Sequence, residues 1–192
     1  MGKKYGEDKD GNTNPLPTTK RDGNEMGGWF TKAGICLPVY NIQTLTIPLS
    51  FATNRKLVKL FQNDCGILTY RLMNNQIKAN ILSDNFDYNI GAIYENYVAQ
   101  ALAAKDIENL YYFSKKQFGE IDFVIESKDK IIPIEVKSGK HYYIHSTINK
   151  IFNGSIKFKD IDYAYVFSNQ NVSSKENIIY LPIYSVVFLN FD

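Results

Sequence analysis

The order of periodic segments in the second half of the chain constrains its fold more than any other feature. Between residues 87 and 105, apolar side chains recur every three or four positions, which predicts a helix with one buried stripe. Three β-rich runs separated by short polar turns follow it, at 110–116, 120–126 and 130–138. A short helical pattern that ends near 153–154 and a strand at 163–168 complete the series. We therefore expect an α/β protein, with an α-β-β-β-α-β core around a mixed sheet.

The first 82 residues carry weaker patterns. Residues 1–28 contain six glycines, two prolines and ten charged side chains, with Leu16 as the sole aliphatic residue. Such a segment cannot bury enough apolar surface to offset its ordering entropy, so we predict a disordered tail. Residues 29–82 are more apolar and hold short extended pieces interrupted by prolines, which indicates a linker region before a domain at 83–192.

Charge and composition exclude several classes of protein. Twenty-two Lys and Arg residues against 20 Asp and Glu give a net charge of +2, so any nucleic-acid-binding charge must be local. Two cysteines are too few for a disulfide scaffold or a four-cysteine zinc site. The N-terminus lacks the apolar core of a secretory signal, and the run 178–189 is too short to span a bilayer. We expect a cytoplasmic protein without membrane contact.

The candidate chemistry lies on two neighbouring strands. Successive side chains of a strand point to opposite faces, so Glu135 and Lys137 share one face while the aliphatic residues between and before them share the other. In the preceding strand, Ile121, Phe123 and Ile125 would form the apolar face and Asp122 would point the other way. If the two strands form a hairpin, Asp122 would lie beside Glu135. Glu95 lies at the margin of the helical stripe, where it could face the same cleft.

Carboxylates that converge in this way repel one another unless a cation binds or a proton is taken up. Their oxygen atoms suit a hard divalent ion such as Mg²⁺ or Mn²⁺, so we predict Glu95, Asp122 and Glu135 as metal ligands. Such an ion lowers the pKa of a bound water and stabilises charge on a phosphoryl oxygen, and Lys137 would orient the water or stabilise the phosphate. Asp122, Glu135 and Lys137 are therefore the predicted catalytic residues of a phosphodiester hydrolase.

These residues carry a resemblance to a known superfamily. Asp122, the Glu135-Val136-Lys137 triplet and the preceding helix with Glu95 resemble the PD-(D/E)XK nuclease-like superfamily and its restriction-endonuclease-like core. More narrowly, GAIYENYVAQAL, GEIDFVIE and IIPIEVKSGK resemble the C-terminal domain of unknown function of prokaryotic AAA-type ATPases. The resemblance implies that residues 29–82 are a small winged-helix-like remnant and that a AAA-type ATPase is the natural context.

The ATPase half of that family is missing from the sequence. The nearest match to a phosphate-binding loop is Gly139-Lys140, where Ile134 replaces the first required glycine and His141 replaces Ser or Thr. We therefore predict no ATP site, and expect the sequence to represent a truncated or split C-terminal piece.

Basic residues follow the catalytic motif and give the predicted nucleic-acid contacts. Lys140, His141 and Lys150 could contact phosphates, although a solvated surface explains them equally well. A zinc site between His141 and His145 is disfavoured because no third ligand is apparent. No separate cofactor-binding residues are evident.

Two functions remain open at this point. The first is a nuclease-like domain that binds DNA and hydrolyses phosphodiester bonds with a divalent metal. The second is a catalytically silent module that binds nucleic acid, a separate ATPase subunit or a second copy of itself.

Overall fold

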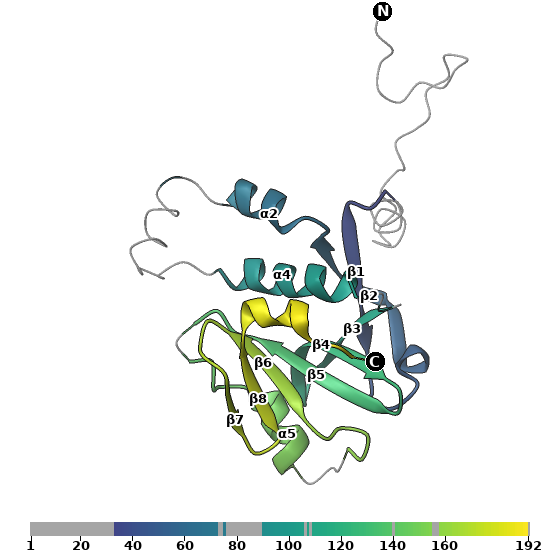
Figure 1. The fold of residues 1–192 in the computed structure, drawn as a ribbon. Coiled ribbons are helices and arrows are strands. Elements are labelled where there is room, and N and C mark those ends of the chain that lie inside the picture. Colours follow the sequence, from purple (N-terminus) through teal and green to yellow (C-terminus); the bar gives the residue numbers. More distant parts are fainter. Residues whose placement is uncertain are drawn as a thin grey trace, which may run out of the picture.

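A computed structural model describes residues 33–72, 75, 90–105, 107, 109–139, 141–154 and 158–191. The predicted disordered tail at 1–28 and the predicted domain boundary at residues 82–83 lie outside these residues. Within them, the chain forms one eight-stranded mixed sheet with helices on both faces (Figure 1). No described helix is long and apolar enough to cross a membrane.

The predicted α-β-β-β-α-β order is present. It consists of α4 (Gly91–Ala103), β3 (Leu110–Lys115), β4 (Gly119–Ser127), β5 (Lys130–Val136), α5 (Ser146–Asn153) and β6 (Ala164–Ser168). The β3, β4 and β5 strands form an antiparallel meander, and β6 then pairs parallel with β5 after the α5 crossover. Beyond β6, the strand β8 (Ile178–Pro182) pairs parallel with it, and the short β7 (Ser173–Lys175) forms the edge.

The segment expected to be a linker or winged-helix-like remnant contributes two strands to the same sheet. The β1 strand (Cys36–Ile42) pairs parallel with β3, and β2 (Thr53–Gln62) pairs antiparallel with β1 at the other edge. A 3-10 helix (Leu49–Ala52) joins the two strands, and α2 (Cys65–Leu72) follows β2. The strand order is therefore β2-β1-β3-β4-β5-β6-β8-β7.

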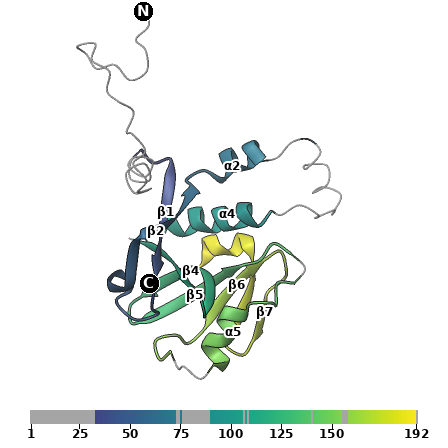
Figure 2. The ribbon, with the colours of Figure 1, turned by 180° about the vertical axis from the view of Figure 1, so that it is seen from behind.

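The two faces of the sheet bury separate cores. On one face, α4 and the 3-10 helix Ile183–Phe188 lie side by side, as seen from both directions in Figures 1 and 2. Their core includes Ile132, Ile134 and Val136 of β5, which confirms the face predicted for these aliphatic residues. On the opposite face, α5 places Ile151 and Ile148 in two further clusters. Burial on both faces explains why β5 is apolar along nearly its whole length.

Candidate active site

A bulge in β4 places Asp122 between the two middle strands. Tyr111 pairs with Val124 and Phe113 pairs with Ile121, so Asp122 and Phe123 together oppose a single residue of β3. The extra residue reverses the alternation of side chains. Phe123 joins the core beneath α4, whereas Ile121 joins the core on the other face. The expectation of one continuous apolar face through Ile121, Phe123 and Ile125 was therefore wrong at Ile121.

The carboxylate of Asp122 takes over a backbone interaction between the strands. The last residue pair in the β4–β5 register is Phe123 with Ile134. Just beyond it, Oδ2 of Asp122 accepts a hydrogen bond of 2.7 Å from the backbone N–H of Val136. The side chain thus occupies the place of a strand partner and fixes its own carboxylate next to the end of β5.

Glu135 and Lys137 form an ion pair at that strand end. Nζ of Lys137 lies 2.7 Å from Oε1 of Glu135. Glu135 is 8% exposed, and its second oxygen, Oε2, is buried without a hydrogen-bond partner. Strand β5 remains fixed here, because Glu135 is paired in register with Val166 of β6 and the N–H of Lys137 donates to Phe167. A buried carboxylate oxygen without a partner is costly unless the group takes up a proton or a cation.

Burial, together with the repulsion between the two charges, makes Glu135 and Asp122 weaker acids than ordinary carboxyl groups. Desolvation, followed by the charge of Asp122, raises the pKa of Glu135 to about 7, although Lys137 opposes the shift. Desolvation also raises the pKa of Asp122, against the hydrogen bond from Val136 and the charges of Lys59 and Lys137. Near pH 7 the pair therefore holds part of a proton that a divalent ion could replace.

The helix α4 brings Glu95 to the same group of charges. The pKa of Glu95 is raised by desolvation and then by the negative charge of Asp122, while Lys59 and Lys137 lower it. The next residue, Asn96, is buried and anchors the helix to β2: it accepts a hydrogen bond from the N–H of Gln62 and donates one to its carbonyl oxygen, at 2.7 and 3.0 Å. Gln100 adds a third link by accepting from the N–H of Cys65. The sequence placed Glu95 at the edge of the helical stripe, and these anchors hold it there.

Two charged residues near the site were not among those predicted. Lys59 of β2 forms an ion pair with Glu120 of β4, and its ammonium lies 4.8 Å from the centre of the Tyr112 ring. Burial opposes the charge of Lys59, but the hydrogen bond to Glu120 and the neighbouring carboxylates outweigh it and raise its pKa. The sequence offered Glu120 as a neighbour of the metal, although a strand-edge carboxylate was the favoured interpretation, and it gave no prediction for Lys59. The signal was a lysine set among Val58, Leu60 and Phe61 in a strand.

The three carboxylates suit a hard divalent cation, but they do not converge into a formed metal site. Glu95, Asp122 and Glu135 supply only oxygen atoms, which Mg²⁺ and Mn²⁺ prefer. The unpartnered Oε2 of Glu135 is the observation that fits such an ion. In the described part of the chain, however, no three His, Cys, Asp or Glu side chains converge closely enough to hold a metal. An ion bound by all three carboxylates would therefore require them to move toward one another.

The predicted nucleic-acid contacts differ in their surroundings. His141 is exposed, and its Nδ1 atom lies 3.2 Å from the hydroxyl of Tyr143. Lys150 donates a 2.6 Å hydrogen bond to the carbonyl of Phe118, and Lys140 lies outside the described residues. His145 is buried at the start of α5, with Nε2 2.7 Å from the Tyr180 hydroxyl. His145 is therefore a buried residue, whereas His141 is accessible to solvent.

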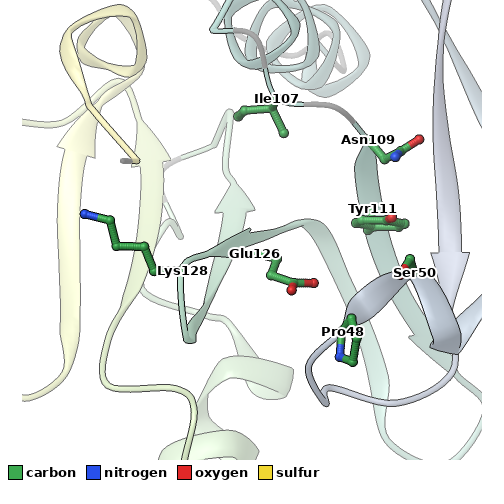
Figure 3. Close-up of a pocket in the computed structure, with 7 residues that line it drawn as sticks. All are labelled: Pro48, Ser50, Ile107, Asn109, Tyr111, Glu126 and Lys128. Carbon is green, nitrogen blue, oxygen red and sulfur yellow. The ribbon is translucent and has the colours of Figure 1, made fainter.

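The structure also contains a pocket of about 380 Å³ whose lining does not include Glu95, Asp122 or Glu135. Figure 3 shows its lining, which comes from the approach to and start of β3, the end of β4, the following turn and the β1–β2 connection: Pro48, Ser50, Ile107, Asn109, Tyr111, Glu126 and Lys128. None of the predicted site residues lines it. Glu126 has a structural role there, because its Oε2 accepts a 2.7 Å hydrogen bond from the N–H of Leu49.

Together these features define a mixed α+β domain with a cluster of carboxylates and lysines at the point where two central strands part. The family described as Domain of unknown function (DUF4143) matches residues 90–186, just over half of the chain. The chain belongs to this family. No curated protein and no solved structure matches it significantly. The match includes α4 and the Asp122, Glu135 and Lys137 positions, but it begins after β2 and therefore leaves Lys59 outside.

Proposed function

We propose that this protein is a nuclease-like domain of the PD-(D/E)XK type, with a restriction-endonuclease-like core, which binds DNA and hydrolyses phosphodiester bonds with Mg²⁺ or Mn²⁺. The observation that carries the proposal is the buried, partly unpartnered carboxylate of Glu135, held beside Asp122 and paired with Lys137. The α-β-β-β-α-β order and the Glu-x-Lys spacing support the same assignment.

Each residue has a separate part in the proposed reaction. Asp122 and Glu135 would hold the ion, with Glu95 as the third carboxylate from α4. The ion, when bound, supplies a water of lowered pKa and stabilises charge on the phosphate. Lys137 lies beside Glu135, and its ammonium group can orient the attacking water and stabilise the negative charge that develops on the phosphoryl oxygens. The backbone N–H of Val136 donates a hydrogen bond to Asp122 and so holds its carboxylate next to the end of β5.

A cleavage assay with matched variants tests the proposal. Plasmid and single-stranded DNA are incubated with the wild-type protein over a range of Mg²⁺ and Mn²⁺ concentrations, and Mn²⁺ binding is measured by calorimetry. Lys137→Ala should still bind Mn²⁺ but lose cleavage, because the lysine acts on water and phosphate. Asp122→Asn should weaken Mn²⁺ binding and abolish cleavage. Absence of Mn²⁺ binding and of cleavage by the folded wild-type protein would refute the catalytic proposal.

The alternative is a catalytically silent module that binds nucleic acid or a protein partner in a AAA-type ATPase assembly. Two observations favour it. The three predicted ligands do not converge into a metal site within the described residues, and Glu135 is already paired with Lys137. This alternative predicts that DNA or an ATPase subunit binds without added metal. It also predicts that Lys137→Ala affects binding no more than Lys116→Ala does.

A further inference from the structure

Lys59 occupies a position that neither the family match nor the sequence motif includes. It lies on β2, the edge strand next to β1, and its side chain is 28% exposed. The ammonium pairs with Glu120 and lies against the Tyr112 ring. It also interacts electrostatically with Asp122 and Glu95. A lysine from the N-terminal hairpin, which β1 and β2 form over residues 36–62, thus contacts a carboxylate of β4 and acts through its charge on the carboxylate of α4.

A simple surface ion pair with Glu120 does not account for this environment. Glu120 is nearly half exposed, and a pair of that kind contributes little to stability. Lys59 also lies over Tyr112, the single β3 residue opposite the bulge that carries Asp122. Its strand is the one that α4 contacts through Gln62 and Asn96, the neighbour of Glu95. The charge of Lys59 accordingly lowers the pKa of Asp122 and of Glu95, both of which burial raises. The cluster contains four carboxyl groups, Glu95, Glu120, Asp122 and Glu135, against the two ammonium groups of Lys59 and Lys137. Lys137 is paired with Glu135, so Lys59 is placed to compensate the negative charges of Asp122 and Glu95.

We infer that Lys59 is the resident counter-ion of the carboxylate cluster and that a divalent cation competes with it for Asp122 and Glu95. The second half of this inference rests on the proposed metal site, whereas the first half does not. Metal binding would release the ammonium of Lys59 from the carboxylates. The N-terminal hairpin is then part of the site, although the family match begins only at residue 90.

A double-mutant cycle without metal tests the counter-ion role. Thermal unfolding is measured near pH 8 for Lys59→Met, Glu95→Gln and the double variant, with EDTA present. Methionine keeps the apolar stem of Lys59 against Tyr112 but removes the charge. Lys59→Met should lower the melting temperature by several degrees in the wild-type background and by clearly less in the Glu95→Gln background, because the unbalanced carboxylate is then absent. Equal effects in the two backgrounds would show that Lys59 does not compensate the charge of Glu95 and would overturn the inference.

Calorimetric titration with Mn²⁺ tests the competition. Lys59→Met should bind Mn²⁺ more tightly than wild type, by about tenfold, because a positive charge near the ligands has been removed. Lys59→Arg, which keeps the charge, and Lys56→Met, an exposed lysine on the same strand, should bind like wild type. Unchanged or weaker binding by Lys59→Met would overturn the competition while leaving the metal site standing. If the wild-type protein binds no Mn²⁺, the proposed metal site and the competition both fail, and the unfolding cycle alone decides the counter-ion role.

Discussion

At the scale of single residues, Glu135 is the most informative position in the protein. Its carboxyl group is buried, and one oxygen is paired with Lys137 while the other has no partner. A hydrophobic residue of similar size would avoid the cost of burying this charge. The folded protein therefore retains a destabilising group at a specific place, a pattern that is typical of functional sites.

The first prediction concerns the pH dependence of stability. The folded protein holds the Glu135 proton up to a pKa of about 7, whereas the unfolded chain releases it near the ordinary value of 4.5. The folded state thus binds more protons between these values, and its stability falls as the pH rises through that range. At about pH 8.5 and without divalent ions, Glu135→Gln should increase the free energy of unfolding by up to roughly 3 kcal/mol. The gain should shrink toward about pH 5, as measured by urea unfolding across the pH range.

An exposed carboxylate provides the control for this measurement. Asp129 is exposed in the turn between β4 and β5, and Asp129→Asn should not increase the free energy of unfolding at about pH 8.5. Lys137, whose side chain is 29% exposed, can be hydrated when Glu135 becomes neutral, so loss of the ion pair should not mask the gain. A Glu135→Gln variant that is less stable than wild type at every pH would contradict the pKa assigned to Glu135.

Sequence patterns could identify the residues on the central strands but not those that approach from elsewhere. Glu135 and Lys137 follow from alternation along one strand, and Asp122 follows from its place in the neighbouring one. Lys59 is more than sixty positions from Asp122 in the sequence. Its proximity depends on β1 pairing parallel with β3, and no local pattern encodes such a long-range pairing.

At the scale of elements, the position of α4 depends on polar contacts as well as on its apolar stripe. Val98, Ala99 and Leu102 bury the helix against the sheet. Asn96 then fixes the rotation of α4 about its axis and its position relative to β2, because it forms hydrogen bonds with both backbone groups of Gln62. Because Glu95 is the adjacent residue, the same contact determines where its carboxylate can reach.

The second prediction tests whether Asn96 anchors α4 to β2. Asn96→Ala would leave the part-buried N–H and carbonyl groups of Gln62 without this partner. We expect a loss of about 2–4 kcal/mol in the free energy of unfolding, since each unsatisfied buried group costs about 1–3 kcal/mol. Gln100→Ala removes a single link to Cys65 and should cost less. Urea unfolding of both variants measures this difference, and equal losses would show that Asn96 is not the main anchor.

The strand β4 shows where element prediction from sequence fails. Its existence and limits were predicted closely, because β-rich residues and flanking turns are local signals. The bulge at Asp122 and Phe123 was not predicted, since it depends on the register against β3. The three-residue β7 was missed for a similar reason: Ser173, Ser174 and Lys175 are exposed and become a strand only by pairing with β8.

At the scale of the whole molecule, the N-terminal hairpin and the family-matched region form one sheet. The hairpin contributes Val39 to the core under α4 and Ile42, Leu45 and Leu49 to the core on the other face, all of them nearly or fully buried. Burial of four such side chains is worth roughly 6–12 kcal/mol, which is comparable to the whole stability of a domain. The hairpin is thus needed both to complete the fold and to supply Lys59.

The last prediction follows from that arrangement. A fragment of residues 90–192 keeps the family-matched region and every predicted catalytic residue, but it lacks β1 and β2. Its strand β3 would become an edge, with the backbone groups that bond β1 left open and apolar residues of both cores uncovered. We expect this fragment to aggregate or to unfold without a cooperative transition, whereas residues 33–192 should unfold cooperatively as a monomer. Size-exclusion chromatography and thermal circular dichroism distinguish the two, and a monomeric, cooperatively folded 90–192 fragment would show that the hairpin is an accessory to the domain and not part of it.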